Sequence, residues 1–209
     1  MPRKNRIKGE KFKIGNVVKS VIRKVLIDKS QGMYVELSRT SPKFLESLLE
    51  LEVPEIKDEM IKIVGSARIP GERAKIALSS LHPNIDAVGA TVGTKGVRIN
   101  AVSKELHNEN IDCIEYSNIP EIFIARALSP AIISNVKIQN GKAIVTLPSD
   151  QKSKAIGKNG INIRLTSMLT GFEIELVESG SSTVSAESSS HDDQPERDPN
   201  ALKNLFGGL

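Results

Sequence analysis

The apolar and polar positions of the chain form two successive groups of predicted elements that share one order. Helical spacing of apolar residues and strand-like alternation separate the helices from the strands. The first group is a helix, two strands, two helices and a strand over residues 42–53, 60–69, 73–79, 86–92, 97–106 and 111–116. The second repeats this order over residues 120–128, 132–138, 143–147, 149–156, 161–169 and 172–177. The pattern predicts two α-β-β-α-α-β units.

Capping and turn residues stand at several of these boundaries. Ser41 and Pro42 suit the N-cap and the first position of the first helix. Pro70-Gly71 separates the first pair of strands, and Asn140-Gly141, the favoured two-residue hairpin turn, separates the second pair. Local signals and hydrophobic pattern therefore agree.

Ahead of the two units, residues 17–27 and 33–38 alternate as the strands of a β-hairpin, with a turn at residues 28–32. A hairpin alone is marginally stable in water, so its missing strands are expected from the next domain, a partner or a longer parent chain. Residues 1–10 are rich in Lys and Arg and hold Ile7 as their one large aliphatic residue after the initiator Met. We expect no core contribution from them.

The last segment, residues 179–209, is rich in Ser and acidic residues and has few large apolar side chains. Such a segment cannot bury enough apolar surface to offset its ordering entropy, so we expect it to be disordered. Leu202, Leu205 and Phe206 near its end follow helical spacing. They predict either a short partner-binding helix or a frayed end.

A glycine-bracketed turn joins the last two helices of each unit, as Gly93-Thr94-Lys95-Gly96 and, 64 residues later, Gly157-Lys158-Asn159-Gly160. The glycines lack Cβ atoms and the second helix begins directly after them, so backbone N–H groups can meet a sugar-phosphate backbone. One such turn could simply let the chain bend. Its recurrence in the same frame, each time with a basic residue inside, favours a phosphate clamp.

Further basic residues lie close to both turns. The candidate nucleic-acid-binding residues are Gly93, Thr94, Lys95, Gly96, Arg98, Lys152, Lys154, Gly157, Lys158, Asn159, Gly160 and Arg164. Bases would lie on the aliphatic surface beside each turn, near Val92 and Ile156. A mononucleotide-binding loop is excluded, because the chain has neither a G-x-x-x-x-G-K-[ST] motif nor a G-x-G-x-x-G motif directly after a strand.

Composition narrows the class of protein. The net charge is +4, and residues 179–209 hold five acidic and two basic residues, which leaves about +7 on residues 1–178 and suits a polyanionic partner. Only 3% of residues are aromatic, which argues against recognition by many stacked rings. One cysteine, Cys113, in an apolar run, indicates a reducing compartment and a buried small hydrophobe. Without an apolar span or signal peptide, we expect a cytoplasmic protein away from membranes.

Residues for catalysis or metal binding are not grouped in the sequence. His82, His107 and His191 are scattered, so we expect no metal and no cofactor. The carboxylates Glu52, Glu55, Asp58 and Glu59 are interpreted as a solvated helix end rather than an acid/base pair. We therefore expect a protein that is not an enzyme.

The α-β-β-α-α-β frame with its G-x-x-G turn resembles the type II K-homology (KH) domain of RNA-binding proteins, whose turn grips the backbone of about four nucleotides. The resemblance extends to the NusA family of bacterial transcription elongation, termination and antitermination factors. It rests on ordered blocks at residues 37–45, 51–56, 66–77, 83–90, 155–158, 164–165 and 169–172. It covers about residues 7–178, with Ala87 where the family usually has Pro and Phe172 where it often has Trp.

The resemblance implies an α+β chain with two tandem type II KH domains. The expected domains are a partial S1 (OB-type) hairpin at 1–40, KH domain 1 at 41–117, KH domain 2 at 118–178 and the disordered acidic tail at 179–209. In the family, a polymerase-binding domain, an S1 domain and two KH domains follow one another, and the last three form one RNA-binding surface. Here the first is absent and the S1 match covers only its last strands. The sequence is then either a fragment or has its start codon placed too late.

The expected function is that of an RNA-binding module that binds nascent single-stranded RNA and modulates pausing, termination and antitermination. The resemblance implies contact with RNA polymerase through the parent protein's missing N-terminal domain, other antitermination factors as further partners, and a monomer. Two alternatives stay open at this point. The units could form a protein-interaction scaffold with an incidental basic surface, or they could bind single-stranded DNA.

Overall fold

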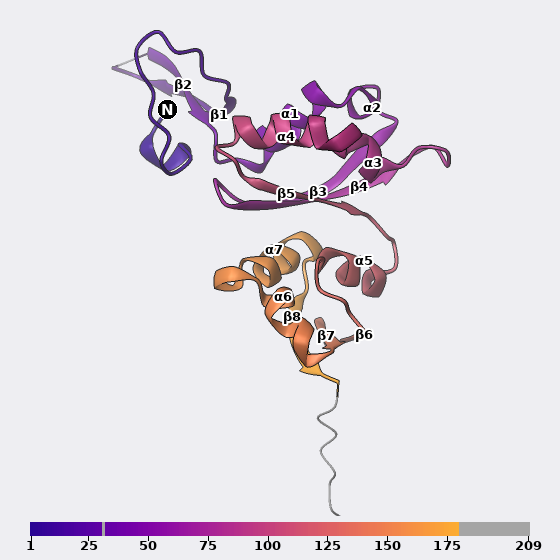
Figure 1. Cartoon of the computed structure of the whole chain (residues 1–209). Helices are drawn as coiled ribbons and strands as arrows, with labels where there is room; N and C mark the ends of the chain where they lie inside the picture. The colour runs from indigo at the N-terminus through magenta and orange to yellow at the C-terminus, as the bar shows by residue number, and fades with distance from the viewer. Residues whose placement is uncertain (31, 180–209) are drawn as a thin grey trace, which may run out of the picture.

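The computed structural model describes residues 1–30 and 32–179. The residues on which a terminal helix was considered, and all but the first residue of the expected disordered tail, lie outside the described part. The described chain consists of an N-terminal segment with a hairpin and two stacked α/β units (Figure 1).

The first unit begins with helix α1 (Pro42–Glu52) and ends with strand β5 (Asn110–Glu115). Between them lie α2 (Pro54–Lys57), β3 (Ile61–Ile69), β4 (Arg73–Ser80), α3 (Ala87–Val92) and α4 (Val97–Glu105). The sheet order is β3-β4-β5, with β3 and β4 antiparallel and β4 and β5 parallel. The helices cover one face of this sheet (Figure 1). The predicted order is confirmed, and the four-residue helix α2 is an addition that the pattern did not predict.

The second unit repeats this topology. It consists of α5 (Pro120–Ala127), β6 (Asn135–Gln139), β7 (Lys142–Leu147), α6 (Lys152–Ile156), α7 (Ile161–Thr170) and β8 (Glu173–Glu178). Its sheet order is β6-β7-β8, again antiparallel then parallel. The helix predicted over residues 149–156 is split into a 3-10 turn, Ser149–Gln151, and α6. The α+β class with two tandem repeats is thus confirmed.

The second unit packs against the open face of the first sheet, opposite its helices (Figure 1). Ala77 and Ile114 of the first sheet form an apolar cluster with Phe123 and Ala127 of α5. The ammonium group of Lys75 is buried beside this cluster, where it donates to Asp112 at 3.1 Å and to the Ser129 carbonyl at 3.1 Å. The apolar cluster and the hydrogen bond from Lys75 to the Ser129 carbonyl cross the boundary between the units.

The N-terminal hairpin consists of β1 (Val21–Asp28) and β2 (Gly32–Ser38), paired antiparallel as a two-stranded sheet. Several large apolar side chains of this hairpin are exposed: Ile22, Val25, Ile27, Met33, Tyr34 and Val35. Their exposure fits the expectation that a hairpin needs further strands to bury its apolar residues.

The expectation that residues 1–10 contribute nothing to a core is wrong. Ile7 is 2% exposed and belongs to the core of the first unit. Its Cγ2 atom lies so close to Gly71 that a Cβ there would stand 2.7 Å away. One aliphatic residue within a charged run has no periodicity, so only the tertiary fold reveals this contact.

Two arginines fasten this segment to the first unit. The Arg39 guanidinium donates to Glu10 at 2.7 Å and to the side chain of Glu105, the last residue of α4, at 2.9 Å. Arg68 on β3 pairs with Glu109 in a fully buried ion pair, with Nε to Oε1 at 2.8 Å, and also donates to the Arg39 carbonyl. Removing one partner of the buried Arg68–Glu109 pair would leave an uncompensated buried charge, so a substitution of either residue alone is expected to be strongly destabilising.

Candidate nucleic-acid interface

The two glycine turns have the same backbone conformation. Gly93 and Gly157 have φ/ψ of 75/167° and 74/172°, and Gly96 and Gly160 have 75/16° and 71/13°. These positive φ angles favour glycine. We call α3, residues 93–96 and α4 the first corner, and α6, residues 157–160 and α7 the second corner.

The third position of each turn is left-handed although it is not glycine. Lys95 has φ/ψ of 53/24° and Asn159 has 55/25°. Asn is among the residues that tolerate this region, whereas for Lys it costs about 1 kcal/mol. Lys95 is the third residue of its turn, like Asn159, whereas Lys158 is the second, like Thr94. The two turn lysines therefore extend from different positions of the shared backbone.

Each turn leaves two backbone amides available. The N–H groups of Gly96 and Gly160 bond back to the carbonyls of Gly93 and Gly157 at 2.9 and 3.1 Å. Within the described residues, the amides of positions 94, 95, 158 and 159 have no protein acceptor. Side chains at positions 94, 95, 158 and 159 are all exposed. Paired free amides beside a lysine are suited to hold an anionic oxygen.

Arg98, a candidate phosphate ligand, is engaged inside the first corner. Its Nη1 donates to the Ala90 carbonyl at 2.7 Å and to Glu55 at 2.8 Å, and its side chain is 31% exposed. It thus ties α4 to the end of α3 and to α2. The interpretation of Glu55 as part of a solvated helix end is corrected accordingly, because this carboxylate pairs with Arg98.

Asn162 takes the corresponding place in the second corner, and the sequence reasoning missed it. Its Nδ2 donates to the carbonyls of Lys154, Ala155 and Leu128 at 3.2, 3.1 and 3.1 Å, and the residue is 2% exposed. Asn162 and Arg98 each follow the first glycine of their turn by five residues. That shared offset is the signal that could have identified both as residues that brace the turn.

The remaining basic candidates are unevenly distributed. Lys152 pairs with Glu178 at 2.7 Å. Lys154, Lys158 and Arg164 are exposed in the second corner, whereas the first corner exposes Lys95 in its turn and Lys104 near the end of α4. None of these five makes an ion pair with a carboxylate in the described part of the chain. The second corner is therefore the more electropositive.

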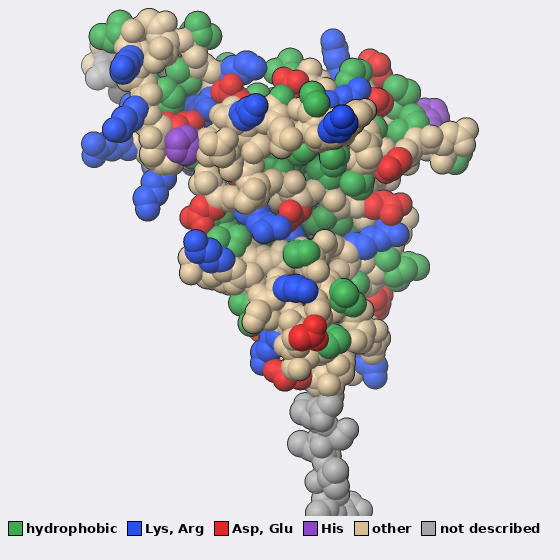
Figure 2. All heavy atoms as spheres, viewed as in Figure 1, with side chains coloured by type: hydrophobic (Ala, Val, Ile, Leu, Met, Phe, Trp, Pro, Cys, Tyr) green, Lys and Arg blue, Asp and Glu red, His purple; other side chains and the backbone are tan. Residues whose placement is uncertain are grey.

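The positive charge of the folded part lies mostly outside the two units. Residues 1–43 hold twelve basic and three acidic residues, a net charge of +9. Residues 44–178 hold fifteen basic and seventeen acidic residues, a net charge of −2. Lys and Arg side chains accordingly gather around the N-terminal segment at the upper left of Figure 2. A polyanion would be attracted there and to the local cations of the corners.

The described residues offer little support for a metal site, a reactive thiol or a membrane-spanning helix. Within residues 1–30 and 32–179, no three His, Cys, Asp or Glu side chains come together to hold a metal ion. Burial raises the pKa of Cys113 to about 12, which makes its thiol a poor nucleophile. Its side chain packs against the first core but is partly rather than fully buried. None of the described helices has the length and apolar character needed to cross a membrane.

Comparison with known proteins gives closely related sequences. Models of the NusA-like first and second KH domains match residues 39–116 and 120–184. The transcription termination/antitermination protein NusA of Helicobacter pylori strain 26695 is 49% identical, over 97% of this chain and 57% of that protein. NusA of Thermus thermophilus is 44% identical, over 85% of this chain and 46% of that protein. The chain thus spans about half the length of these relatives.

Proposed function

This chain belongs to the NusA family, and from that premise we propose that its two KH domains clamp one single-stranded RNA at their glycine turns. The observation that carries the proposal is the shared backbone of the two turns, each with a pair of amides that lack a protein acceptor. A phosphate oxygen would accept from these amides while Lys95 or Lys158 supplies positive charge. Glycine keeps the approach open, since no Cβ stands between the strand and the backbone.

The bases would lie beside the turns. Val92 and Ile156 directly precede the first glycine of each turn and are half-buried, so each presents part of an aliphatic side chain to solvent. Clamping of the backbone of about four nucleotides by the G-x-x-G loop is the recognition mode of KH domains. The N-terminal segment, with its net charge of +9, would accelerate capture of the polyanion.

In the cell, we propose, the bound strand is the nascent transcript, and the module modulates pausing, termination and antitermination without catalysing a reaction. Support comes from the relatives, which are named transcription termination/antitermination proteins. RNA polymerase would be contacted through a part of the parent protein beyond this chain, and other antitermination factors would be further partners. The module would act as a cytoplasmic monomer divided at residues 1–40, 41–117, 118–178 and 179–209, the first being a partial S1 domain.

The proposal is tested by reversing charge inside both turns at once. The variant Thr94→Asp/Lys95→Asp/Lys158→Asp/Asn159→Asp should lose at least tenfold in affinity for single-stranded RNA at low salt, because carboxylates would face the phosphates. Asp tolerates the left-handed position, so the fold should survive. Fluorescence anisotropy with a labelled oligonucleotide measures the loss.

A control of equal charge isolates the effect of position. Lys57→Asp/Lys62→Asp/Lys137→Asp makes the same net charge change of −6 at exposed sites that lie outside both corners and make no ion pair in the described residues. Equal losses in the two variants would contradict clamping at the turns. No RNA binding by the unmodified chain would favour the scaffold alternative, and equal affinity for a matched DNA strand would favour a general single-strand binder.

A further inference from the structure

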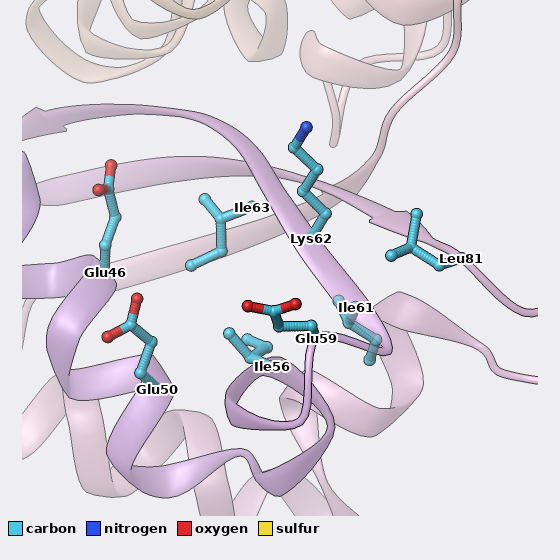
Figure 3. Close-up of a pocket in the computed structure, with 8 residues that line it drawn as sticks. All are labelled: Glu46, Glu50, Ile56, Glu59, Ile61, Lys62, Ile63 and Leu81. Atoms are coloured by element: carbon cyan, nitrogen blue, oxygen red, sulfur yellow. The ribbon is translucent and has the colours of Figure 1, made fainter.

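A groove of about 430 Å³ lies on the first KH domain, between α1, the turn that precedes β3 and the start of β3 itself (Figure 3). Its apolar lining is formed by Ile56, Ile61 and Ile63. Leu81, which is 59% exposed, extends this apolar surface at one end. No residue of either glycine turn lines the groove, so it is distinct from the proposed RNA clamp.

Three carboxylates surround the apolar lining. Glu46 and Glu50 extend from neighbouring turns of α1, and Glu59 comes from the turn before β3 (Figure 3). Glu46 accepts a hydrogen bond from the Ser66 hydroxyl, and none of the three makes an ion pair within the described residues. Lys62 also lines the groove, but its ammonium group points away from Glu50 and Glu59 (Figure 3). The groove therefore attracts cations and repels phosphates.

The groove also opens onto backbone that no strand pairs. The sheet order places β3 at an edge, and residues 61–63 of this strand line the groove. An edge strand presents N–H and C=O groups that can pair with another extended chain. Addition of such a chain to a sheet edge, with alternate side chains entering pockets, is a recurring mode of peptide recognition.

We propose that this groove binds an extended segment of a partner protein that carries alternating basic and apolar residues. The segment adds to β3 as a further strand through main-chain hydrogen bonds. Alternate side chains of a strand point to opposite faces, so the Lys or Arg side chains of the segment face the groove together and its apolar side chains lie on the other face. The aliphatic stems of these basic residues contact Ile56 and Ile63, and their charged ends meet Glu46, Glu50 and Glu59. Charge complementarity selects this occupant, since three uncompensated carboxylates would repel RNA. The same first KH domain would then bind RNA at its turn and protein at its sheet edge.

A peptide titration on the full chain tests this proposal. The probe is a capped hexapeptide of alternating lysine and valine, followed by the backbone amide shifts of the protein in NMR spectra. We expect shifts confined to residues 46–50 and 59–66. The variant Glu50→Lys/Glu59→Lys should weaken peptide binding at least tenfold, and a probe with glutamate in place of lysine should not bind.

The control variant Glu72→Lys/Glu175→Lys makes the same charge change at two exposed carboxylates that line no part of the groove. It should leave peptide affinity within twofold of the unmodified chain. Equal weakening by both variants, or shifts spread over all acidic surfaces, would overturn the proposal and leave the carboxylates as a guard against edge pairing. Shifts at residues 61–64 on addition of single-stranded RNA would also overturn it. Loss of RNA clamping at the turns would not, because the groove shares no residue with them.

Discussion

The first and second corners have the same backbone conformation, but different side chains support it. In the first corner the brace is Arg98, a partly exposed cation paired with Glu55. In the second it is Asn162, a buried neutral amide that binds three carbonyl oxygens. Both residues bond the carbonyl at the same offset in the preceding helix, Ala90 in one and Lys154 in the other. The conformation is thus what the two domains share, and the supporting side chains are free to differ.

This comparison separates a rigid corner from a more adaptable one. The second corner has its brace in the core and more exposed cations, whereas the first relies on an ion pair that solvent can reach. A partly exposed pair is weakened by salt, but a buried amide network is not. We therefore expect the second corner to contribute most of the RNA affinity and to tolerate substitution least.

The largest difference is expected for the first glycine of each turn. A Cβ on Gly157 would stand 2.7 Å from Asn162 Cβ and 3.0 Å from the Asn162 backbone nitrogen, which cannot move aside. A Cβ on Gly93 would meet the flexible Arg98 side chain at 2.9 Å. Gly157→Ala should therefore lower the free energy of unfolding by about 3 kcal/mol and Gly93→Ala by about 1.5 kcal/mol. Urea unfolding measures both, and equal losses would contradict the distinction.

The braces should show the next largest difference. Asn162→Ala removes the donor that the Lys154, Ala155 and Leu128 carbonyls share, and only the Leu128 carbonyl keeps another donor in the Ala131 N–H, so we expect a loss of about 2 kcal/mol in the free energy of unfolding. Arg98→Ala removes a partly exposed ion pair and one hydrogen bond, so a loss of about 1 kcal/mol is expected. Repeating both measurements in 1 M salt supplies the check. The cost of Arg98→Ala should shrink there, and a similar shrinkage for Asn162→Ala would argue against the buried network.

Neutralising exposed cations of each corner should change the salt dependence of RNA affinity by different amounts. Neutralising Lys154, Lys158 and Arg164 to Gln should lower the slope of log affinity against log salt by roughly 2, since each lost phosphate contact removes about 0.7 for a single strand. Lys95→Gln should lower it by about 0.7. Anisotropy titrations between 50 and 300 mM salt would show this. A larger effect of Lys95 alone would reverse the assignment of the dominant corner.

The smallest effect is expected when the third turn residue of one corner is replaced by that of the other. Lys95→Asn places a residue that tolerates the left-handed region where Lys is strained, so stability should rise by about 0.5–1 kcal/mol while RNA affinity falls. Asn159→Lys should do the opposite in both measurements. Thermal unfolding and anisotropy on the two variants test the pair. If Lys95→Asn were destabilising, Lys95 would have a structural role that its exposure does not suggest.

Much of the fold was predictable because its signals are local. The repeated order of elements, the Asn140-Gly141 turn, where both residues have positive φ, and the Ser41-Pro42 start of α1 all follow from short-range preferences. The errors concern contacts between distant residues. Ile7 enters the first core and Arg98 pairs with Glu55, 43 positions away. Neither contact leaves a local pattern in the sequence, because its two partners are far apart along the chain.

The sequence by itself determined the two repeated frames and the glycines that bracket each turn, because periodicity and positive φ are properties of short segments. Only the tertiary structure decided which basic side chains stay available. It drew Arg98 and Lys152 into ion pairs and left Lys95, Lys154, Lys158 and Arg164 exposed. It also placed β3 at an open edge beside three carboxylates. Whether a basic side chain or a strand edge can bind a partner depends on the residues packed next to it, and those residues are far away along the chain.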